Sequence, residues 1–177
     1  MALKATIFKA ELQISDMDRH YYGAHALTIA RHPSETDERM MMRVFAFARH
    51  ASEALAFGKG LSADDEPDLW QKDLTGAIEL WVEVGQPDEK RIMKAAGRAA
   101  QVIVYSYSSH SRIWWEQIAG KIGRAKNVAV YQIEPAASTA LAKMAQRTMQ
   151  LQCTIQDGEL WMNAGDESVH IVPLLLR

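Results

Sequence analysis

The sequence predicts an α/β protein with a mixed central β-sheet, helices on both faces of that sheet, and a β-hairpin at each end of the chain. Two successive strand–helix–strand patterns occupy residues 78–133, and alternating strand patterns lie before them at 5–33 and after them at 151–171. Crossovers of this length favour parallel pairing of the central strands with right-handed connections. Because no linker, repeat or low-complexity stretch interrupts the chain, we expect one domain over 1–177.

The N-terminal part of the chain predicts two strands followed by a long helix. Residues 5–15 and 25–33 alternate in polarity on either side of a polar turn, which is typical of a hairpin. Ser34 resembles a helix N-cap, and apolar side chains then recur at helical spacing as far as Leu55. We expect Gly58 and Gly60, which follow shortly afterwards, to end this helix.

The middle of the chain alternates strands with helices. An acidic stretch leads into a short strand, and residues 78–85 then predict a strand with alternate apolar side chains on one face. Pro87 lies where the first turn of a helix accepts proline, and a basic helix follows it. The run VIVY at 102–105 is typical of a central strand that is covered on both faces. A helix over 111–125 and an apolar strand over 127–133 complete the pattern.

Four valines give this arrangement a direct test. We expect Val102, Val104, Val128 and Val130 to be buried in adjacent parallel strands. Residues 137–149 predict one further helix.

The C-terminal tail predicts the second hairpin. Leu151, Cys153 and Ile155 alternate with polar residues, and Asp157 and Gly158 then form a turn. Since Cys153 is the one cysteine of the sequence, nothing points to an oxidising compartment. The N-terminus lacks the apolar run of a signal peptide, and no later segment approaches the length of a membrane span. We therefore expect a cytoplasmic protein with no membrane contact.

Charge is distributed unevenly along the chain. The formal net charge is −2, but residues 90–126 carry eight basic side chains against one acidic side chain. Such a region can bind the phosphates of nucleic acid, or it can simply form the solvated outer faces of two helices. The eight basic residues are Lys90, Arg91, Lys94, Arg98, Arg112, Lys121, Arg124 and Lys126.

Two acidic residues are candidates for metal chemistry. Asp68 follows Pro67, and Glu83 lies near the end of the apolar strand at 78–85. Adjacent antiparallel strands of this spacing can bring both carboxylates to one end of a sheet, where a hard cation such as Mg²⁺ would use them as ligands. The side chain of Glu83 alternates with the apolar face, so we expect it to be partly enclosed. The spacing alone is equally compatible with two ordinary surface acids.

Three sequence strings carry a family resemblance: PDLW, WVEVGQPDEKRIMKA and QVIVYSY. They resemble the signature of the YaeQ family, and the order of helices and strands along the whole chain is similar as well. The resemblance implies the fold of the PD-(D/E)xK nuclease superfamily. In that pattern a Pro-Asp supplies one metal ligand, and an acid-x-Lys on the next strand supplies a second ligand and a lysine. Asp68 matches the first ligand and Glu83 the second, which implies a Mg²⁺ site.

The third element of that pattern does not match. Gly85 stands where the pattern places lysine, so the cation that would orient the attacking water or stabilise the phosphate is missing from its usual place. Lys90 and Lys94, one turn apart on the following helix, are the available substitutes. Gln86 can instead give a neutral hydrogen bond to a metal-bound water.

Several alternatives stay open at this point. The family pattern often adds an acid from an earlier helix, and both Glu38 and Glu53 are candidates for it. One hypothesis is a Mg²⁺-dependent phosphodiester hydrolase that acts on nucleic acid. Its rival is a non-catalytic module that keeps the nuclease-like fold and binds nucleic acid or a protein through the basic region. The missing lysine favours the module, whereas the retention of both acids favours the enzyme. A third interpretation is a small-molecule-binding or structural protein.

Overall fold

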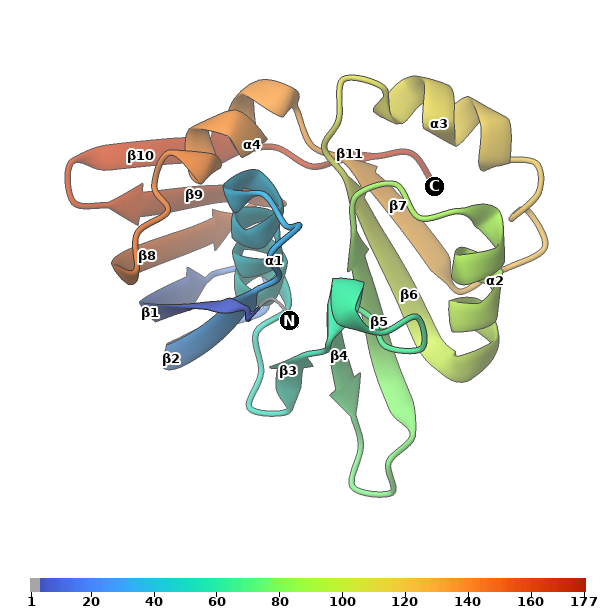
Figure 1. Ribbon diagram of the computed structural model, residues 1–177, viewed down its shortest axis with the longest axis horizontal. Helices are drawn as coiled ribbons and strands as arrows, with labels where there is room; N and C mark the ends of the chain where they lie inside the picture. Colours follow the sequence, from blue (N-terminus) through green and yellow to red (C-terminus); the bar gives the residue numbers. More distant parts are fainter. Residues whose placement is uncertain (1–3) are drawn as a thin grey trace. The chain divides into compact units, whose positions relative to one another are not determined.

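The computed structural model describes residues 4–177, and these residues form two compact units. The first unit comprises the described residues up to Arg49 together with Ala136–Pro173, and the second comprises His50–Pro135 with Leu174–Arg177. Each unit contains its own β-sheet (Figure 1). The expectation of a single domain over 1–177 stays a prediction.

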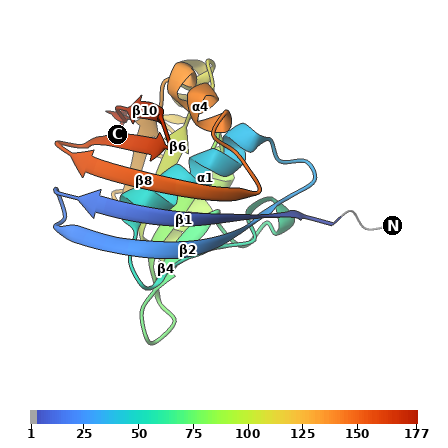
Figure 2. The same ribbon diagram turned by 90° about the vertical axis from the view of Figure 1, so that its left-hand side faces the viewer.

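The first unit is built on a five-stranded sheet in the order β10-β9-β8-β1-β2 (Figure 2). Strand β1 pairs antiparallel with β2 and parallel with β8. The predicted N-terminal hairpin and the C-terminal hairpin around Asp157 and Gly158 are both confirmed. The elements are β1 (Thr6–Asp16), β2 (Tyr21–Arg31), α1 (Asp37–His50), α4 (Pro135–Ala142), β8 (Thr148–Gln156), β9 (Glu159–Ala164) and β10 (Glu167–Ile171).

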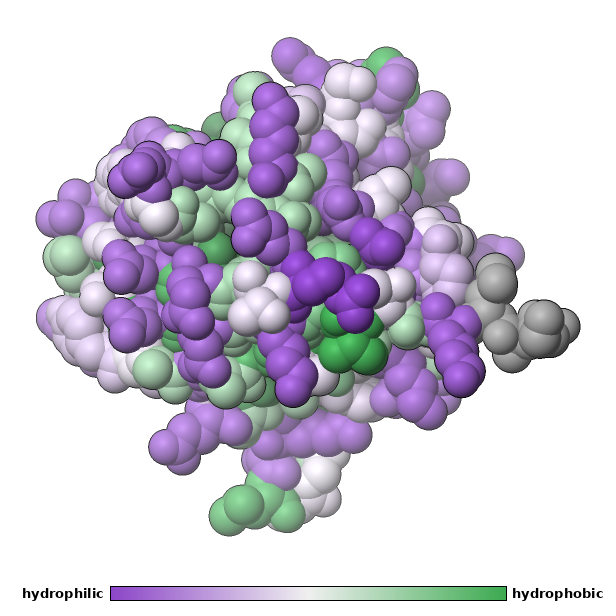
Figure 3. Space-filling model, turned by 60° about the vertical axis from the view of Figure 1, so that its left-hand side comes forward, coloured by the Kyte–Doolittle hydropathy of each residue, from purple (hydrophilic) through white to green (hydrophobic). Residues whose placement is uncertain are grey.

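The two hairpins are not appendages of a central sheet, and this corrects the predicted arrangement. They join through β1 and β8 into a sheet of their own. An isolated hairpin is at best marginally stable in water, because it cannot bury its apolar face. Pairing β1 with β8 aligns Leu12 with Leu151 and Ile14 with Cys153, and all four side chains are buried. The outward face of this sheet is largely hydrophilic in the view of Figure 3.

Helix α1 differs from its predicted boundaries at both ends. Thr36 rather than Ser34 caps it, because the Thr36 hydroxyl accepts a hydrogen bond of 3.1 Å from the Arg39 amide. The helix ends at His50, and Leu55 begins the short strand β3 (Leu55–Phe57). Leu55 fitted the helical spacing because it is buried, but its burial comes from a strand.

The second unit is built on a six-stranded sheet in the order β11-β7-β6-β5-β4-β3. Strands β5, β6 and β7 are parallel, and the remaining strands pair antiparallel. Val102 lies opposite Val128 and Val104 opposite Val130, and all four are buried, which confirms the predicted core. The further elements are β4 (Leu69–Lys72), β5 (Ile78–Val84), α2 (Glu89–Arg98), β6 (Ala99–Ser106), α3 (Ser111–Ile118), β7 (Val128–Gln132) and β11 (Leu174–Leu175), with a 3₁₀ turn at Gly60–Ser62.

Helices α2 and α3 cover one face of the six-stranded sheet (Figure 1). Ile92 of α2 and Ile118 of α3 belong to the same buried cluster as Val102 and Val128. The helices of the second unit therefore cover one face of its six-stranded sheet. The sequence had predicted helices on both faces of the central sheet. Asp88 caps α2 by accepting a hydrogen bond from the Arg91 amide, so Pro87 precedes the cap and does not form the first turn.

Cys153 is buried within β8, as its strand pattern predicted. Burial is the main cause that raises the pKa of its thiol to about 12. Among residues 4–177, no helix is both long and apolar enough to cross a membrane. The cytoplasmic location stays a prediction.

Candidate functional site

Strands β4 and β5 bring Asp68 and Glu83 together, as the strand spacing predicted. Leu69 pairs with Val82, so Asp68 lies one position before β4, next to Glu83 across the ladder. Asp68 Oδ2 accepts a hydrogen bond of 2.9 Å from the Val84 amide. Both acids are buried, with exposed fractions of 0% for Asp68 and 3% for Glu83. Glu83 is thus fully enclosed rather than partly enclosed.

A glycine loop holds the backbone at Asp68. The amides of Gly58 and Gly60 donate to the carbonyls of Asp68 and Pro67, at 3.0 and 3.2 Å. A Cβ atom at Gly58 would lie 2.2 Å from the Pro67 carbonyl oxygen, and one at Gly60 would lie 2.7 Å from Asp68 Oδ1. The sequence pattern predicted a helix that ends at Gly58. The role of Gly58 is instead to let two backbone segments approach closely beside a buried acid.

Arg91 is the cation that contacts Glu83, and the sequence analysis missed it. Glu83 Oε1 accepts hydrogen bonds from Arg91 Nε at 2.8 Å and from Trp81 Nε1 at 2.9 Å. The other guanidinium nitrogens of Arg91 donate to the carbonyls of Asp64 and Glu66, at 3.0 and 2.9 Å. The arginine therefore ties the acidic loop before β4 to the buried carboxylate.

The predicted substitute cations remain in solvent. Lys90, Lys94 and Gln86 are all exposed. Successive residues of a helix point about 100° apart, so Arg91 faces the sheet while its lysine neighbour does not. An arginine three residues after the helix cap Asp88 was the available signal for this inward contact. The catalytic roles proposed for Gln86, Lys90 and Lys94 stay predictions.

Glu83 has an unusual affinity for protons. Its burial and the nearby charge of Asp68 raise the pKa of Glu83 to about 7, while Arg91 and Trp81 act in the opposite direction. Arg91 is paired with Glu83, and Asp68 adds a second carboxylate to the same buried site. As a result, the site changes its charge close to neutral pH.

The backbone at position 85 disfavours lysine, the residue that the predicted PD-(D/E)xK pattern places there. Gly85 has a φ of +109°, and no atom lies within 4 Å of the position of a Cβ there. Space is therefore available, but L-amino acids rarely adopt this conformation. The Gly85 amide donates to the Tyr105 carbonyl at 2.8 Å, which anchors the turn to β6. A lysine cannot occupy position 85 without strain.

No third acid completes a metal site. Glu38 lies in the first unit, where its carboxylate accepts hydrogen bonds from Ser138 and Thr139, and Glu53 is exposed in a turn of the second unit. In the chain from residue 4 onward, no group of three or more His, Cys, Asp or Glu side chains could hold a metal ion. One oxygen of Glu83 is already bound by two donors. The residues present therefore fit a hard cation only in part.

The basic region divides into inward and outward side chains. Arg91 turns inward. Arg98 is exposed, although its guanidinium donates to the Asp65 carbonyl at 2.7 Å. Lys121 Nζ lies 4.0 Å from Glu89 Oε2, so the segment after α3 runs beside the start of α2. Seven basic side chains are exposed: Lys90, Lys94, Arg98, Arg112, Lys121, Arg124 and Lys126.

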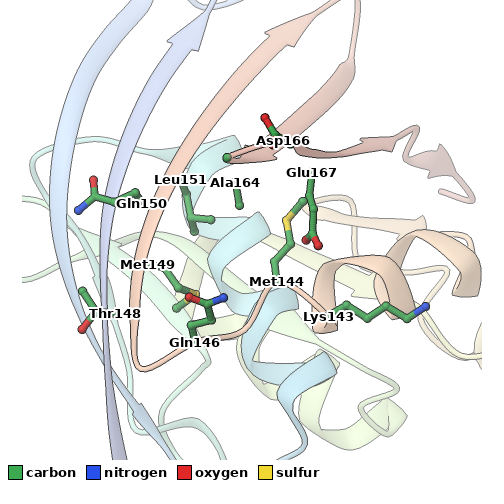
Figure 4. Close-up of a pocket in the computed structure, with 11 residues that line it drawn as sticks. Lys143, Met144, Gln146, Thr148, Met149, Gln150, Leu151, Ala164, Asp166 and Glu167 are labelled. Atoms are coloured by element: carbon green, nitrogen blue, oxygen red, sulfur yellow. The ribbon is translucent and has the colours of Figure 1, made fainter.

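The first unit contains a cavity of about 500 Å³ that the sequence analysis did not anticipate (Figure 4). Met149 and Leu151 of β8 are buried and belong to its lining, together with residues of the β9–β10 turn. Lys143 and Asp166 extend in different directions away from Met149 (Figure 4). The charged groups of this cavity do not converge on one point, and it contains none of the predicted site residues.

Comparison with known proteins assigns the family. The model of the family described as YaeQ protein matches residues 1–173. The chain belongs to the YaeQ family. A YaeQ protein of Salmonella typhi is 45% identical over 172 residues, covering 97% of this chain and 95% of its relative. The YaeQ protein of Escherichia coli K12 is 44% identical with the same coverage.

Crystal structures of YaeQ proteins share the fold. The YaeQ protein from Xanthomonas axonopodis pv. citri has a TM-score of 0.94 and 48% identity, covering 98% of each chain. The YaeQ protein from Pseudomonas syringae also has a TM-score of 0.94, with 36% identity, covering 98% of this chain and 96% of its own. The predicted YaeQ resemblance is therefore confirmed. The assignment to the PD-(D/E)xK superfamily stays a prediction.

Proposed function

We propose that this YaeQ-family chain is a non-catalytic nucleic-acid-binding module that contacts phosphates through its outer helical layer. The observation that carries the proposal is the set of seven exposed basic side chains on α2, on α3 and on the segment after α3. Clustered cations on one face bind a polyanion by releasing its counterions.

The two helices present these cations side by side. Both pack on the same buried cluster, and Trp114 Nε1 of α3 donates to the Pro87 carbonyl just before α2, at 3.0 Å. The 4.0 Å approach of Lys121 to Glu89 puts a cation from the α3 side beside the first turn of α2. A phosphate backbone that lies along this layer would meet cations from both helices.

The buried acids support a module rather than an enzyme. Glu83 is bound by Arg91 and Trp81, and Gly85 has a backbone conformation that disfavours lysine. Two donors thus occupy one oxygen of Glu83, and lysine is disfavoured where a hydrolase of the family pattern needs a cation beside the phosphate. The nuclease-like fold would then serve as a scaffold, and function would lie on the helical surface.

Binding to short duplex DNA and to single-stranded RNA tests the proposal. We expect the affinity to fall steeply between about 50 mM and about 200 mM salt, because each phosphate contact adds to the salt slope. The double variant Lys90→Glu and Lys94→Glu should weaken binding by more than about tenfold and reduce the slope by about two.

The matched control places the same charge change in the first unit. Lys9→Glu with Lys143→Glu alters the net charge equally at exposed positions. This control should retain most of the affinity. Absence of binding at low salt, or equal losses in both double variants, would overturn the proposal and favour a small-molecule-binding or structural protein.

A Mg²⁺-dependent phosphodiester hydrolase at Asp68 and Glu83 is the second candidate. The observation that favours it is a pair of adjacent buried carboxylates, one with its pKa raised to about 7 by burial and by the other acid. Thermal unfolding with Mn²⁺ tests it, since an ion that binds only the native state raises the melting temperature. A hydrolase requires a shift that Glu83→Gln abolishes and that Glu79→Gln, at an exposed acid of the same strand, leaves intact.

A further inference from the structure

Strand β2 forms a long open edge of the five-stranded sheet. It is the last strand in the sheet order, and it pairs with β1 over eleven residues without a register shift (Figure 2). An edge strand presents unpaired N–H and C=O groups, and proteins usually protect such a strand with charged residues, proline or a bulge.

The ladder shows which backbone groups face the open edge. The Lys9 amide donates to the Arg147 carbonyl of the parallel neighbour, at 2.8 Å, so the backbone groups of Lys9 point toward β8. Alternate residues of β1 then point toward β2, and Ala10, for example, pairs with Leu27. The intervening residues of β2 must face outward: Tyr22, Ala24, Ala26, Thr28 and Ala30.

This set of five residues, hereafter the β2 edge, lacks the usual protection. All five side chains are exposed, and none is charged or proline. Four of the five positions are alanine or threonine, so another strand can approach closely. With no bulge along β2, the five residues carry about ten backbone donors and acceptors. The Ala30 carbonyl accepts a hydrogen bond of 3.0 Å from Arg43 Nη2, and the other groups stand ready for a partner.

The β2 edge is complementary to itself. In an antiparallel pair centred on Ala26, edge-facing residues meet edge-facing residues, and Ala24 lies opposite Thr28. At the strand ends Tyr21 lies opposite Arg31, so no two like charges are apposed. Arg31 already forms an ion pair with Asp37 of its own chain, which offsets its charge.

We infer that two copies of this chain associate through antiparallel pairing of their β2 edges, which makes a continuous sheet across a two-fold axis at Ala26. Overlap from residue 21 to residue 31 gives about eight inter-strand hydrogen bonds, because Arg43 already binds the Ala30 carbonyl of each copy. Both copies use the same residues in the same register, as an isologous interface requires. This inference does not depend on the nucleic-acid proposal.

Substitution at the axis gives the most specific test. Ala26→Lys places two like charges directly opposite each other, and Ala26→Asp does the same with the opposite sign. By sedimentation equilibrium between about 5 and about 300 μM, we expect the unmodified chain to dimerise and each variant to dimerise at least about tenfold more weakly. An equimolar mixture of the two variants should restore the dimer, because lysine then faces aspartate.

The control adds the same charge elsewhere on the same face of the sheet. Gln13→Lys lies at an exposed position of β1, which is an inner strand, and should dimerise like the unmodified chain. A monomeric unmodified chain over the whole concentration range would overturn the inference. So would dimerisation of Ala26→Lys at unmodified strength, or a mixture that stays monomeric.

A cross-link provides an independent measurement if charge at position 26 impairs folding. Ala26→Cys should form a disulfide-linked dimer on oxidation, since facing Cα atoms in such a pair lie about 5.5 Å apart. Ala24→Cys faces Thr28 and should not. The native Cys153 is buried with a pKa of about 12, so its thiol does not compete. Equal cross-linking at both positions would contradict the register.

Discussion

Glu35 in the first unit and Glu83 in the second are both buried acids that pair with arginine. They differ in the charges that surround the carboxylate. Arg43 donates to both carboxylate oxygens of Glu35, at 2.6 and 2.9 Å, and Arg39 adds a third bond of 2.7 Å. One negative charge therefore meets two positive charges. This arrangement links helix α1 to the segment that precedes it.

Glu83 has the opposite balance. Arg91 contacts one of its oxygens, and Asp68 brings a second negative charge into the same buried space. The consequence is a pKa raised to about 7, caused first by burial and then by Asp68. The ratio of cations to carboxylates thus separates an architectural ion pair from a site that can accept a proton or an ion.

The largest effect should come from breaking the balanced pair. Arg43→Met leaves Glu35 buried with one partly exposed arginine, and we expect the free energy of unfolding to fall by about 3–5 kcal/mol. Arg39→Met is the matched control, because the Arg39 side chain is 16% exposed against 6% for Arg43. It should cost about 1 kcal/mol. Urea denaturation measures the free energy of unfolding of both variants. Equal losses would mean that the burial of each arginine does not determine its contribution to stability.

The unbalanced site should appear as a pH dependence. The folded pKa of Glu83, about 7, exceeds its ordinary value of 4.5, so the native state binds a proton that the unfolded state has lost. This group therefore adds stability below pH 4.5, and that contribution is lost as the pH rises through 7, by about 3 kcal/mol in total.

Glu83→Gln removes this titration while its amide oxygen can still accept from Trp81 and Arg91. The stability of Glu83→Gln relative to the unmodified chain should rise by about 3 kcal/mol between pH 4.5 and pH 8. Glu79→Gln, at an exposed position of the same strand, should leave the difference flat. Parallel pH profiles for Glu83→Gln and the unmodified chain would contradict the raised pKa.

The smallest effect should come from adding a second cation near Asp68 and Glu83. Gly85→Lys would introduce the lysine of the predicted PD-(D/E)xK pattern, and the ratio of cations to carboxylates would then be closer to that at Glu35. The φ of +109° opposes this change, and we expect a loss of about 2 kcal/mol. Gly97→Lys in helix α2, where φ is not positive, should be neutral or stabilising. A Gly85→Lys variant that unfolds at the same urea concentration as the unmodified chain would show that this turn tolerates lysine.

The sequence by itself determined the elements whose pattern is local. The apolar runs at Val102–Val104 and Val128–Val130 predicted parallel inner strands, because a strand covered on both faces needs apolar residues at successive positions. The proximity of Asp68 and Glu83 was also predictable, since a short antiparallel connection between β4 and β5 restricts the register.

The tertiary structure alone decided the remaining features. The parallel pairing of β1 with β8 joins segments that are far apart in sequence, so no local pattern specifies it. Leu55 belongs to a strand although its spacing continued that of a helix, because burial produces the same apolar signal in both. The partner of Glu83 is Arg91 rather than Lys90 or Lys94, since the packing of α2 on the sheet sets which basic side chain faces inward.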